Sequence, residues 1–430
     1  MSSTADLLKQ ANELKSSKPA EAEKIYKRIL QHTAGPSEPR TSNGERDQSL
    51  RDQETALVNL GELYRDNKNA EGLAEVITLS RSFMSSTAKA KTAKLIRTLL
   101  DFFTPIPDSA PTQIRVLKDN IEWAKNEKRI FLKQSLETRL AGIYLDTLQF
   151  KPALTLIDSL LTELRRLDDK MILTEVHLIE SRVYRGTGNM PKAKAALTSA
   201  RTAANSIYCP PHLQAALDLQ SGVLHAEDKD YTTAYSYFFE SFENMGNQGD
   251  EEGSLKALKY MLLCKVMLNL SEDVNLLLSI KLAAKYAQLR EVESMRAVAR
   301  AHQNRNLADF EKALRDYRDE LSSDPTIRSH LAALYDTLLE QNLLRIVEPY
   351  SVVEVEYVAQ QVGQGRQEVE AKLSQMILDK IFHGVLDQGR GCLLVYDEPE
   401  VDNSYGAAID TLAQVGNVVD SLYAKTVKIA

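Results

Sequence analysis

Histidines are the first place to look for chemistry, because imidazole ligates metals and exchanges protons near neutral pH. Zinc-dependent hydrolysis needs closely spaced histidines and a carboxylate, so that the metal and the attacking water are held together. The seven histidines form neither an H-x-H nor an H-E-x-x-H pattern: His32, His177, His212, His225, His302, His330 and His383. We therefore expect no metal site, and we interpret His225 and His302 as packing residues.

Glycine spacing gives no sign of a nucleotide site. The P-loop pattern G-x-x-x-x-G-K-[ST] is absent. The pairs Gly186–Gly188 and Gly363–Gly365 lack the third glycine of a dinucleotide-binding loop, and no G-x-S-x-G motif marks a hydrolase nucleophile. We interpret these glycines as turns that end helices, and we expect a non-enzymatic chain without catalytic residues or a cofactor.

The composition predicts a folded intracellular protein. Hydrophobic residues make up 43% of the 430 residues, which is enough for a sizeable core. Cys209, Cys264 and Cys392 are too far apart for a zinc ribbon or a disulfide framework. The N-terminal segment MSSTADLLKQ lacks the pattern of a signal peptide. The longest apolar stretch, YMLLCKVMLNL, is too short to span a bilayer, so we expect no membrane contact.

Most of the first three quarters of the sequence repeats one plan at intervals of about 40 residues. In each copy a helix ends near an aromatic residue or a histidine, a short polar turn follows, and a second helix rich in Ala and Leu begins. The anchors are Tyr64, Tyr144, Tyr184 and His225, and six residues after them stand Ala70, Phe150, Met190 and Tyr231. We expect a further copy around residues 91–103. This pattern predicts an α-solenoid of irregular helical pairs similar to tetratricopeptide repeats.

A different architecture begins near Asp324, which is expected to cap a helix that Pro325 begins. A short extended segment, a helix ending at Gly363 and a helix from Gln367 follow. Two short apolar runs then flank Gly389-Arg390-Gly391, which predicts a β-hairpin and, with the helices, a winged helix. The side chains expected in its core are Val369, Leu373, Met376 and Ile377.

The outward face of the helix from Gln367 decides whether this module could read DNA. That face carries three carboxylates and two ammonium groups: Glu368, Glu370 and Asp379, with Lys372 and Lys380. Arginine, which suits guanine edges and phosphates, stands nearby only as Arg366 and Arg390. The whole chain has a formal charge of -7, and DNA binding depends on neutralising phosphates. We predict that the winged helix does not bind nucleic acid.

The C-terminal segment carries an apolar stripe at the spacing of a heptad seam. Its members follow one another at steps of 4, 3, 4 and 3: Ala408, Leu412, Val415, Val419 and Leu422. Burial of four aliphatic side chains contributes on the order of 6–12 kcal/mol. We therefore expect the stripe to be covered, either by the chain's own winged helix or in a bundle with neighbouring subunits.

Two groups of basic residues have two interpretations each. Lys89, Lys91, Lys94 and Arg97 fall near one another on one predicted helix, and Lys125, Lys128, Arg129 and Lys133 lie near the next helical pair. Each group forms either a solvated face or a docking surface for an acidic partner.

Helical repeats, a winged helix and a C-terminal helix together resemble the layout of PCI-domain proteins, which occur in the proteasome lid, the signalosome and a translation initiation factor. The segments ARTAANSIYCPP, HAEDKDYTTAYSYFFESFE, LKYMLLCKVMLNL and LSQMILDKIFHGVLDQG resemble a family of non-ATPase subunits of the 26S proteasome lid. Residues 33–50 are the least family-like part.

The resemblance implies a scaffold found in cytoplasm and nucleus. Its winged helix and C-terminal helix would join other lid subunits, and its N-terminal solenoid would contact the ATPase ring and the α-ring of the proteolytic core. We expect a monomer in isolation that becomes part of a hetero-oligomer. The alternatives are an adaptor that captures substrates in the solenoid groove, and a PCI scaffold of a signalosome or translation-initiation type of complex.

The expected domains follow the same order along the chain. Residues 1–220 form the N-terminal solenoid, with a mobile loop at 33–50. Residues 221–326 form the helical part of the PCI module, 327–400 the winged helix and 401–430 the bundle helix.

Overall fold

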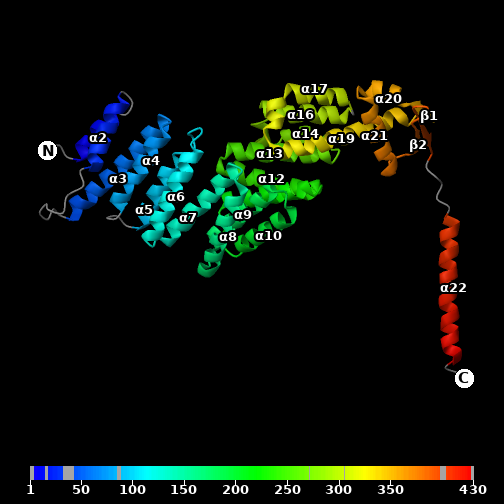
Figure 1. The fold of residues 1–430 in the computed structure, drawn as a ribbon, viewed down its shortest axis with the longest axis horizontal. Helices are drawn as coiled ribbons and strands as arrows, with labels where there is room; N and C mark the ends of the chain where they lie inside the picture. The colour runs from blue at the N-terminus through cyan, green and yellow to red at the C-terminus, as the bar shows by residue number, and fades with distance from the viewer. Residues whose placement is uncertain are drawn as a thin grey trace. The chain divides into compact units, whose positions relative to one another are not determined.

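A computed structural model describes residues 4–14, 18–31, 43–84, 89–270, 272–304, 306–397 and 403–427. These residues form helices and one small sheet (Figure 1). The chain divides into two compact units: unit 1 contains Met1–Asp230 and Glu240–Asp250, and unit 2 contains Tyr231–Phe239 and Glu251–Ala430. The division falls within α12 (Tyr231–Gln248), whereas the predicted boundary between residues 220 and 221 falls inside α11 (Pro211–Glu227).

Unit 1 is built from helices that follow in sequence order, and most of them pack on the next helix along the chain. Besides α11 and the end of α12, they are α1 (Thr4–Leu14), α2 (Pro19–Gln31), α3 (Asn43–Asp66), α4 (Ala70–Met84), α5 (Lys89–Asp101), α6 (Ala110–Asn126), α7 (Ile130–Asp146), α8 (Phe150–Leu167), α9 (Lys170–Gly186) and α10 (Met190–Asn205).

The predicted repeat is confirmed by the backbone of the turns. One set of residues in the left-handed conformation recurs at intervals of 40 or 41: Lys68, Asp108, Leu148, Gly188, Lys229 and Asn269. Further left-handed residues, Lys128, Asp168 and Gly249, lie about halfway between members of this set. At Lys68 the turn has the two hydrogen bonds of a Schellman motif, from Lys68 N to Arg65 O (3.0 Å) and from Asn69 N to Tyr64 O (2.9 Å). The same pair of bonds recurs at Leu148, Gly188, Lys229 and Asn269.

The anchor positions mark these turns. Their carbonyls accept the Schellman hydrogen bond that comes from the residue five positions later, and the residues six positions later are the first residues of α4, α8, α10 and α12. Helices α5 and α6 supply the copy that was expected between Tyr64 and Tyr144.

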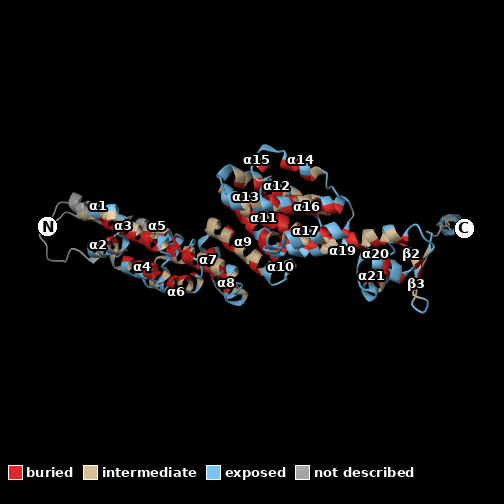
Figure 2. Ribbon diagram, turned by 90° about the horizontal axis from the view of Figure 1, so that it is seen from above, coloured by how far each residue is buried: buried red, intermediate tan, exposed pale blue. Residues whose placement is uncertain are grey.

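The core of unit 1 depends on close approach of neighbouring helices. Figure 2 shows the buried residues along the inner sides of the helices, and one apolar cluster runs from Ala11 to Val183. A Cβ atom on Gly72 would lie 2.7 Å from the Tyr64 ring, and one on Gly186 would lie 2.7 Å from the Phe150 ring. Both rings therefore need glycine as their partner.

One expectation about unit 1 was too broad. The segment at residues 33–50 was predicted as a loop, but α3 begins at Asn43, so residues 43–50 are helical. The composition is misleading here because Glu, Arg and Gln are good helix formers, and the one glycine, Gly44, stands in the first helical turn. Residues 33–42 lie outside the described part of the chain.

Unit 2 begins with further helices and ends in the winged helix and a long C-terminal helix. Its helices after α12 are α13 (Glu251–Met267), α14 (Asp273–Leu278), α15 (Lys281–Ala284), α16 (Arg290–Gln303), α17 (Leu307–Asp316), α18 (Arg318–Ser322), α19 (Pro325–Val347), α20 (Val355–Val362), α21 (Arg366–Leu378) and α22 (Asn403–Val427).

The predicted start of α19 is confirmed in detail. Asp324 accepts a hydrogen bond from the N–H of Thr326 (2.9 Å), and Pro325 is the first helical residue. Burial alone would raise the pKa of Asp324, but the Tyr260 hydroxyl (2.5 Å), the charge of Lys256 and the Thr326 bonds outweigh burial and lower it. Asp324 thus caps α19 as a carboxylate.

The winged helix contains one strand more than the predicted hairpin. Strands β2 (His383–Asp387) and β3 (Cys392–Tyr396) form the hairpin, and β1 (Val352–Glu354) pairs with β3, which gives the antiparallel order β1-β3-β2. Val369, Leu373 and Met376 are fully buried as predicted, and Ile377 is half-buried.

None of the described helices combines the length and apolar character needed to cross a bilayer.

Candidate protein-interaction surfaces

The histidines and acidic residues do not form a chemical centre in the described part of the chain, where no three His, Cys, Asp or Glu residues are placed to hold a metal ion. His177 Nδ1 lies 2.8 Å from Glu180 on the same helix, and the buried His330 ring meets the Tyr231 ring edge-on at 5.9 Å. His302 is buried, but His225, expected as a packing residue, has 41% of its side chain exposed.

Two of the three cysteines lie where burial raises the pKa of the thiol. Burial raises the pKa of the Cys264 thiol to about 12, so this residue remains protonated at neutral pH. Burial, together with the charge of Asp218, raises the pKa of Cys209 as well. A protonated thiol is a poor nucleophile and a poor metal ligand.

Two of the cationic side chains on and beside α21 form ion pairs within the winged helix. Lys372 forms an ion pair with Glu340 of α19 (2.8 Å), and Arg366 forms one with Glu370 one turn along α21 (2.8 Å). Because Lys372 and Arg366 are paired with carboxylates, they are less available to offset the repulsion between the carboxylates of α21 and a nucleic-acid backbone.

The sheet of the winged helix offers edges for another chain. β1 and β2 are the outer strands, and apolar side chains on them are exposed, with Val352 at 54% and Val385 at 50%. An outer strand has unpaired backbone groups that can accept a further strand or loop. The sequence predicted a short extended segment here but not its pairing as a strand of the sheet, because three residues are too few for an alternating pattern to be recognised.

The predicted seam lies on α22 with its side chains exposed. Leu412 is 71% exposed, Val415 52%, Val419 57% and Leu422 57%, and Ala408 is exposed as well. In this structure the seam is therefore not packed on the winged helix. The packing of the seam in a bundle with neighbouring subunits remains a prediction.

α22 carries a second apolar stripe that was not predicted. Tyr405, Ile409 and Tyr423 are 75%, 66% and 72% exposed. With three further residues of α22 they form one series at steps of 4, 3, 4, 3 and 4: Tyr405, Ile409, Leu412, Gly416, Val419 and Tyr423. A second heptad count, offset by three residues from the first, would have found this stripe. A helix with two adjacent stripes can contact more than one neighbouring helix.

The predicted basic face on α5 is described only in part. Lys94 and Arg97 are exposed and lie three residues apart, hence on one side of the helix. Lys89 and Lys91 belong to α5, but their side chains lie outside the described part of the structure.

Arg97 also lines a groove of about 830 Å³ in unit 1. Charges of both signs line it: Arg139 donates to Asp101 (2.5 Å) and to the carbonyl of Leu100 (2.7 Å), and Glu175 lies further along. Burial raises the pKa of Glu175, and the charges of His212 and Arg97 oppose that rise. Because charges of both signs line the groove, its charge would favour neither an acidic nor a basic partner.

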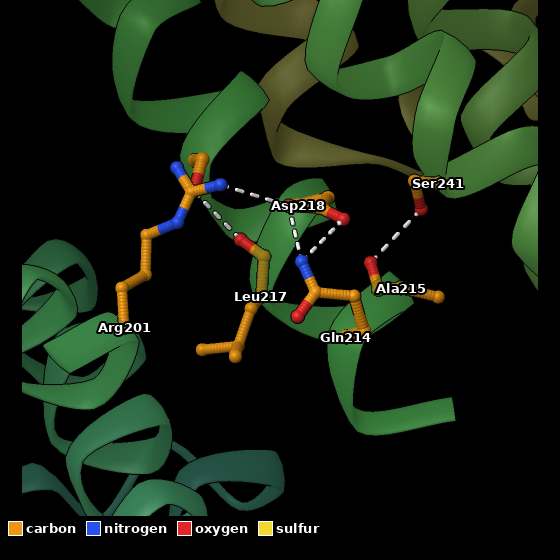
Figure 3. Close-up of polar contacts among 7 residues, drawn as sticks. Arg201, Gln214, Ala215, Leu217, Asp218 and Ser241 are labelled. Carbon is orange, nitrogen blue, oxygen red and sulfur yellow. Dashed lines mark hydrogen bonds and ion pairs between the residues drawn. The ribbon is translucent and has the colours of Figure 1, made fainter. Parts of the chain in front are cut away.

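Buried and partly buried polar contacts join α10 to α11, and α11 to α12, within unit 1 (Figure 3). Arg201 donates to Asp218 (3.1 Å) and to Ser221 (3.2 Å), and Gln214 donates to both carboxylate oxygens of Asp218 (3.2 and 3.0 Å). Ser241 of α12 donates to the carbonyl of Ala215 (3.0 Å). The groups that donate to the Asp218 carboxylate, Arg201 and Gln214, are side chains of α10 and α11. We therefore interpret these contacts as ones that fix how the helices pack.

Comparison with protein families and individual proteins agrees with this architecture. The model of the 26S proteasome regulatory subunit RPN6 N-terminal domain matches residues 4–147, the PCI domain model matches 314–397, and the RPN6 C-terminal helix model matches 401–426. The matches cover unit 1 as far as α7, the winged helix and α22.

Individual relatives are similar along most of their length. The probable 26S proteasome regulatory subunit rpn6 of Schizosaccharomyces pombe is 52% identical over 98% of both chains. The RPN6 subunit of Saccharomyces cerevisiae is 48% identical over 94% of both, and the non-ATPase regulatory subunit 11 homolog of Arabidopsis thaliana is 48% identical over 89% of this chain and 91% of its own. The resemblance predicted from the sequence is confirmed. The chain belongs to the RPN6 family of 26S proteasome regulatory subunits, which is a non-catalytic family with a PCI domain.

Proposed function

We propose that this chain is a structural scaffold of the regulatory-particle lid, and that α22 drives its assembly by joining a bundle of helices from other lid subunits. The observation that carries this proposal is the exposure of Leu412, Val415, Val419 and Leu422, between 52% and 71%. Aliphatic side chains at heptad spacing are normally covered, because their exposure to water is unfavourable.

The winged helix supplies a second assembly surface in this proposal. Outer strands β1 and β2, with the exposed Val352 and Val385, form the two edges of the sheet, and neighbouring subunits cover them. The ion pairs Lys372–Glu340 and Arg366–Glu370 support a protein partner over a nucleic acid. Since the two edges differ, different neighbours cover them, and the isolated chain is a monomer.

The N-terminal solenoid forms the bridge to the rest of the complex, contacting the ATPase ring and the α-ring of the core. The match of an RPN6 N-terminal model to residues 4–147 supports this part, as do the exposed Lys94 and Arg97 of α5. The scaffold thus serves ubiquitin-dependent protein degradation, and we place it in cytoplasm and nucleus with the complex.

Affinity purification of the tagged chain from its own cells, at moderate salt, tests the proposal. Mass spectrometry should recover lid, ATPase and core subunits, and the eluate should have ATP-dependent peptidase activity. A chain lacking residues 401–430 is the control, and it should recover none of these subunits while remaining folded by circular dichroism. Recovery of signalosome or initiation-factor subunits, or of substrates alone, would replace this proposal with one of the competing scaffold or adaptor roles.

A further inference from the structure

Unit 1 contains a second basic surface, separate from α5, at an edge formed by three consecutive helices. The C-terminal ends of α6 and α8 meet the N-terminal end of α7 around a pocket of about 450 Å³. Five cationic residues line it: Lys125, Lys128, Arg129, Lys133 and Arg166.

Only part of this positive charge is neutralised inside the pocket. The Lys133 ammonium lies 2.8 and 2.9 Å from the two oxygens of Glu163 and 3.6 Å from Glu137. Among the described residues, no carboxylate forms an ion pair with Lys128 or Arg166, and both side chains are exposed at the rim. The mouth of the pocket is therefore positively charged.

The pocket also exposes apolar surface between these charges. Ile130 is 50% exposed and Leu167 46%, and both line the pocket. Basic residues near helix C-termini are common because they offset the helix dipole, which accounts for Lys125 and Arg166. That explanation does not cover Lys128, which stands in the turn after α6, or the exposure of the two aliphatic side chains.

We propose that this pocket binds an acidic peptide segment of a partner protein, with one aliphatic side chain between Ile130 and Leu167 and carboxylates against Lys128 and Arg166. Charge complementarity with the cationic rim selects this occupant. The proposal goes beyond the scaffold role, and it is tested on the chain alone, so its failure leaves that role untouched.

The chain contains a built-in reporter for such binding. Trp123 is its only tryptophan, and the Arg129 guanidinium lies 4.9 Å from the centre of the Trp123 ring. A carboxylate bound at Lys128, the residue before Arg129, changes the electrostatic surroundings of this contact and hence the tryptophan fluorescence. We would titrate the full chain with a synthetic peptide of glutamates around a central leucine, without aromatic residues. The expected result is a saturable change whose midpoint rises with salt concentration.

Two matched double variants separate pocket binding from general charge attraction. Lys128→Glu with Arg166→Glu should weaken binding at least tenfold. Lys68→Glu with Arg165→Glu should change it less than twofold. Lys68 has the same left-handed backbone (φ 53° against 54°) and Arg165 is the neighbour of Arg166, yet neither lines the pocket.

The unmodified chain provides a second test of the apolar contact. A peptide with serine in place of leucine should bind at least tenfold more weakly. Three outcomes would overturn the proposal: equal weakening by both double variants, equal affinity for the leucine and serine peptides, and tighter binding of an RNA oligonucleotide than of the acidic peptide.

Discussion

Asp218 shows how a single buried carboxylate is held by a charged and a neutral donor. Its side chain is 1% exposed, and burial raises its pKa, against the opposing effects of the Gln214 hydrogen bond and the Arg201 charge. Between the usual value of 3.8 and the raised one, the folded state binds the proton more tightly than the unfolded state. The contribution of Asp218 to stability therefore falls as pH rises through that interval.

The substitution Arg201→Met should reveal this balance. At neutral pH it leaves Asp218 charged, buried and without its cationic partner, which should lower the free energy of unfolding by about 3 kcal/mol. Acidification should shrink the loss, because Asp218 then takes up a proton. Urea unfolding at pH 7.5 and at pH 5 measures both values. Addition of Asp218→Asn to the variant should recover much of the loss, and a loss that is equal at both pH values would contradict this account.

At the scale of elements, the repeated turns dominate the architecture of unit 1. Each needs one residue in the left-handed conformation, which glycine adopts without strain and other residues adopt at a cost. The protein uses glycine at position 188 but leucine at the equivalent position 148, where φ is +58° and the side chain is 72% exposed.

Substitutions at these two turn positions give a paired prediction. Leu148→Gly should raise the free energy of unfolding by about 0.5–1 kcal/mol, because it relieves backbone strain and removes no packing. Gly188→Ala should lower it by about 1 kcal/mol through the backbone alone, since a Cβ there would meet no atom within 4 Å. Denaturant unfolding of both variants is the measurement. Changes of the same sign would show that side-chain contacts, and not the turn conformation, control stability at these positions.

The elements that could be predicted from the sequence are those with long or repeated patterns. Tyr64, Tyr144 and Tyr184 recur at fixed distances from a turn, so the helical pairs were predictable, and Val369, Leu373 and Met376 identified the core side of α21. The start of α3 was not predictable, because charged helix formers resemble a polar loop. The extended segment of β1 was predicted, but its pairing in the sheet was not, because three residues carry no period.

Interaction surfaces were predicted less completely than the fold. The first stripe of α22 was predictable from its own spacing, whereas the pocket beside Trp123 joins residues from three helices whose side chains meet only in the folded chain. The roles of both surfaces remain proposals.

At the scale of the whole molecule, the surfaces offered to partners lie on separate elements, and α22 can be altered without touching a core. Replacement of Leu412, Val415, Val419 and Leu422 with serine should leave both units folded, because every described side chain of α22 is exposed. The same change should abolish incorporation into the complex, since it removes apolar burial on the order of 6–12 kcal/mol from the bundle.

The matched control places four serines elsewhere on the same helix, at Ala413, Gln414, Asn417 and Ala424, outside both apolar stripes. Both variants lower helix propensity, so a difference between them reports the stripe and not the helix. Co-purification of lid subunits should be retained by the control and lost by the seam variant, while thermal unfolding of the two isolated chains should be alike. Normal incorporation of the seam variant would mean that α22 is not the element that recruits this subunit, and the edge strands β1 and β2 would then have to supply the binding energy.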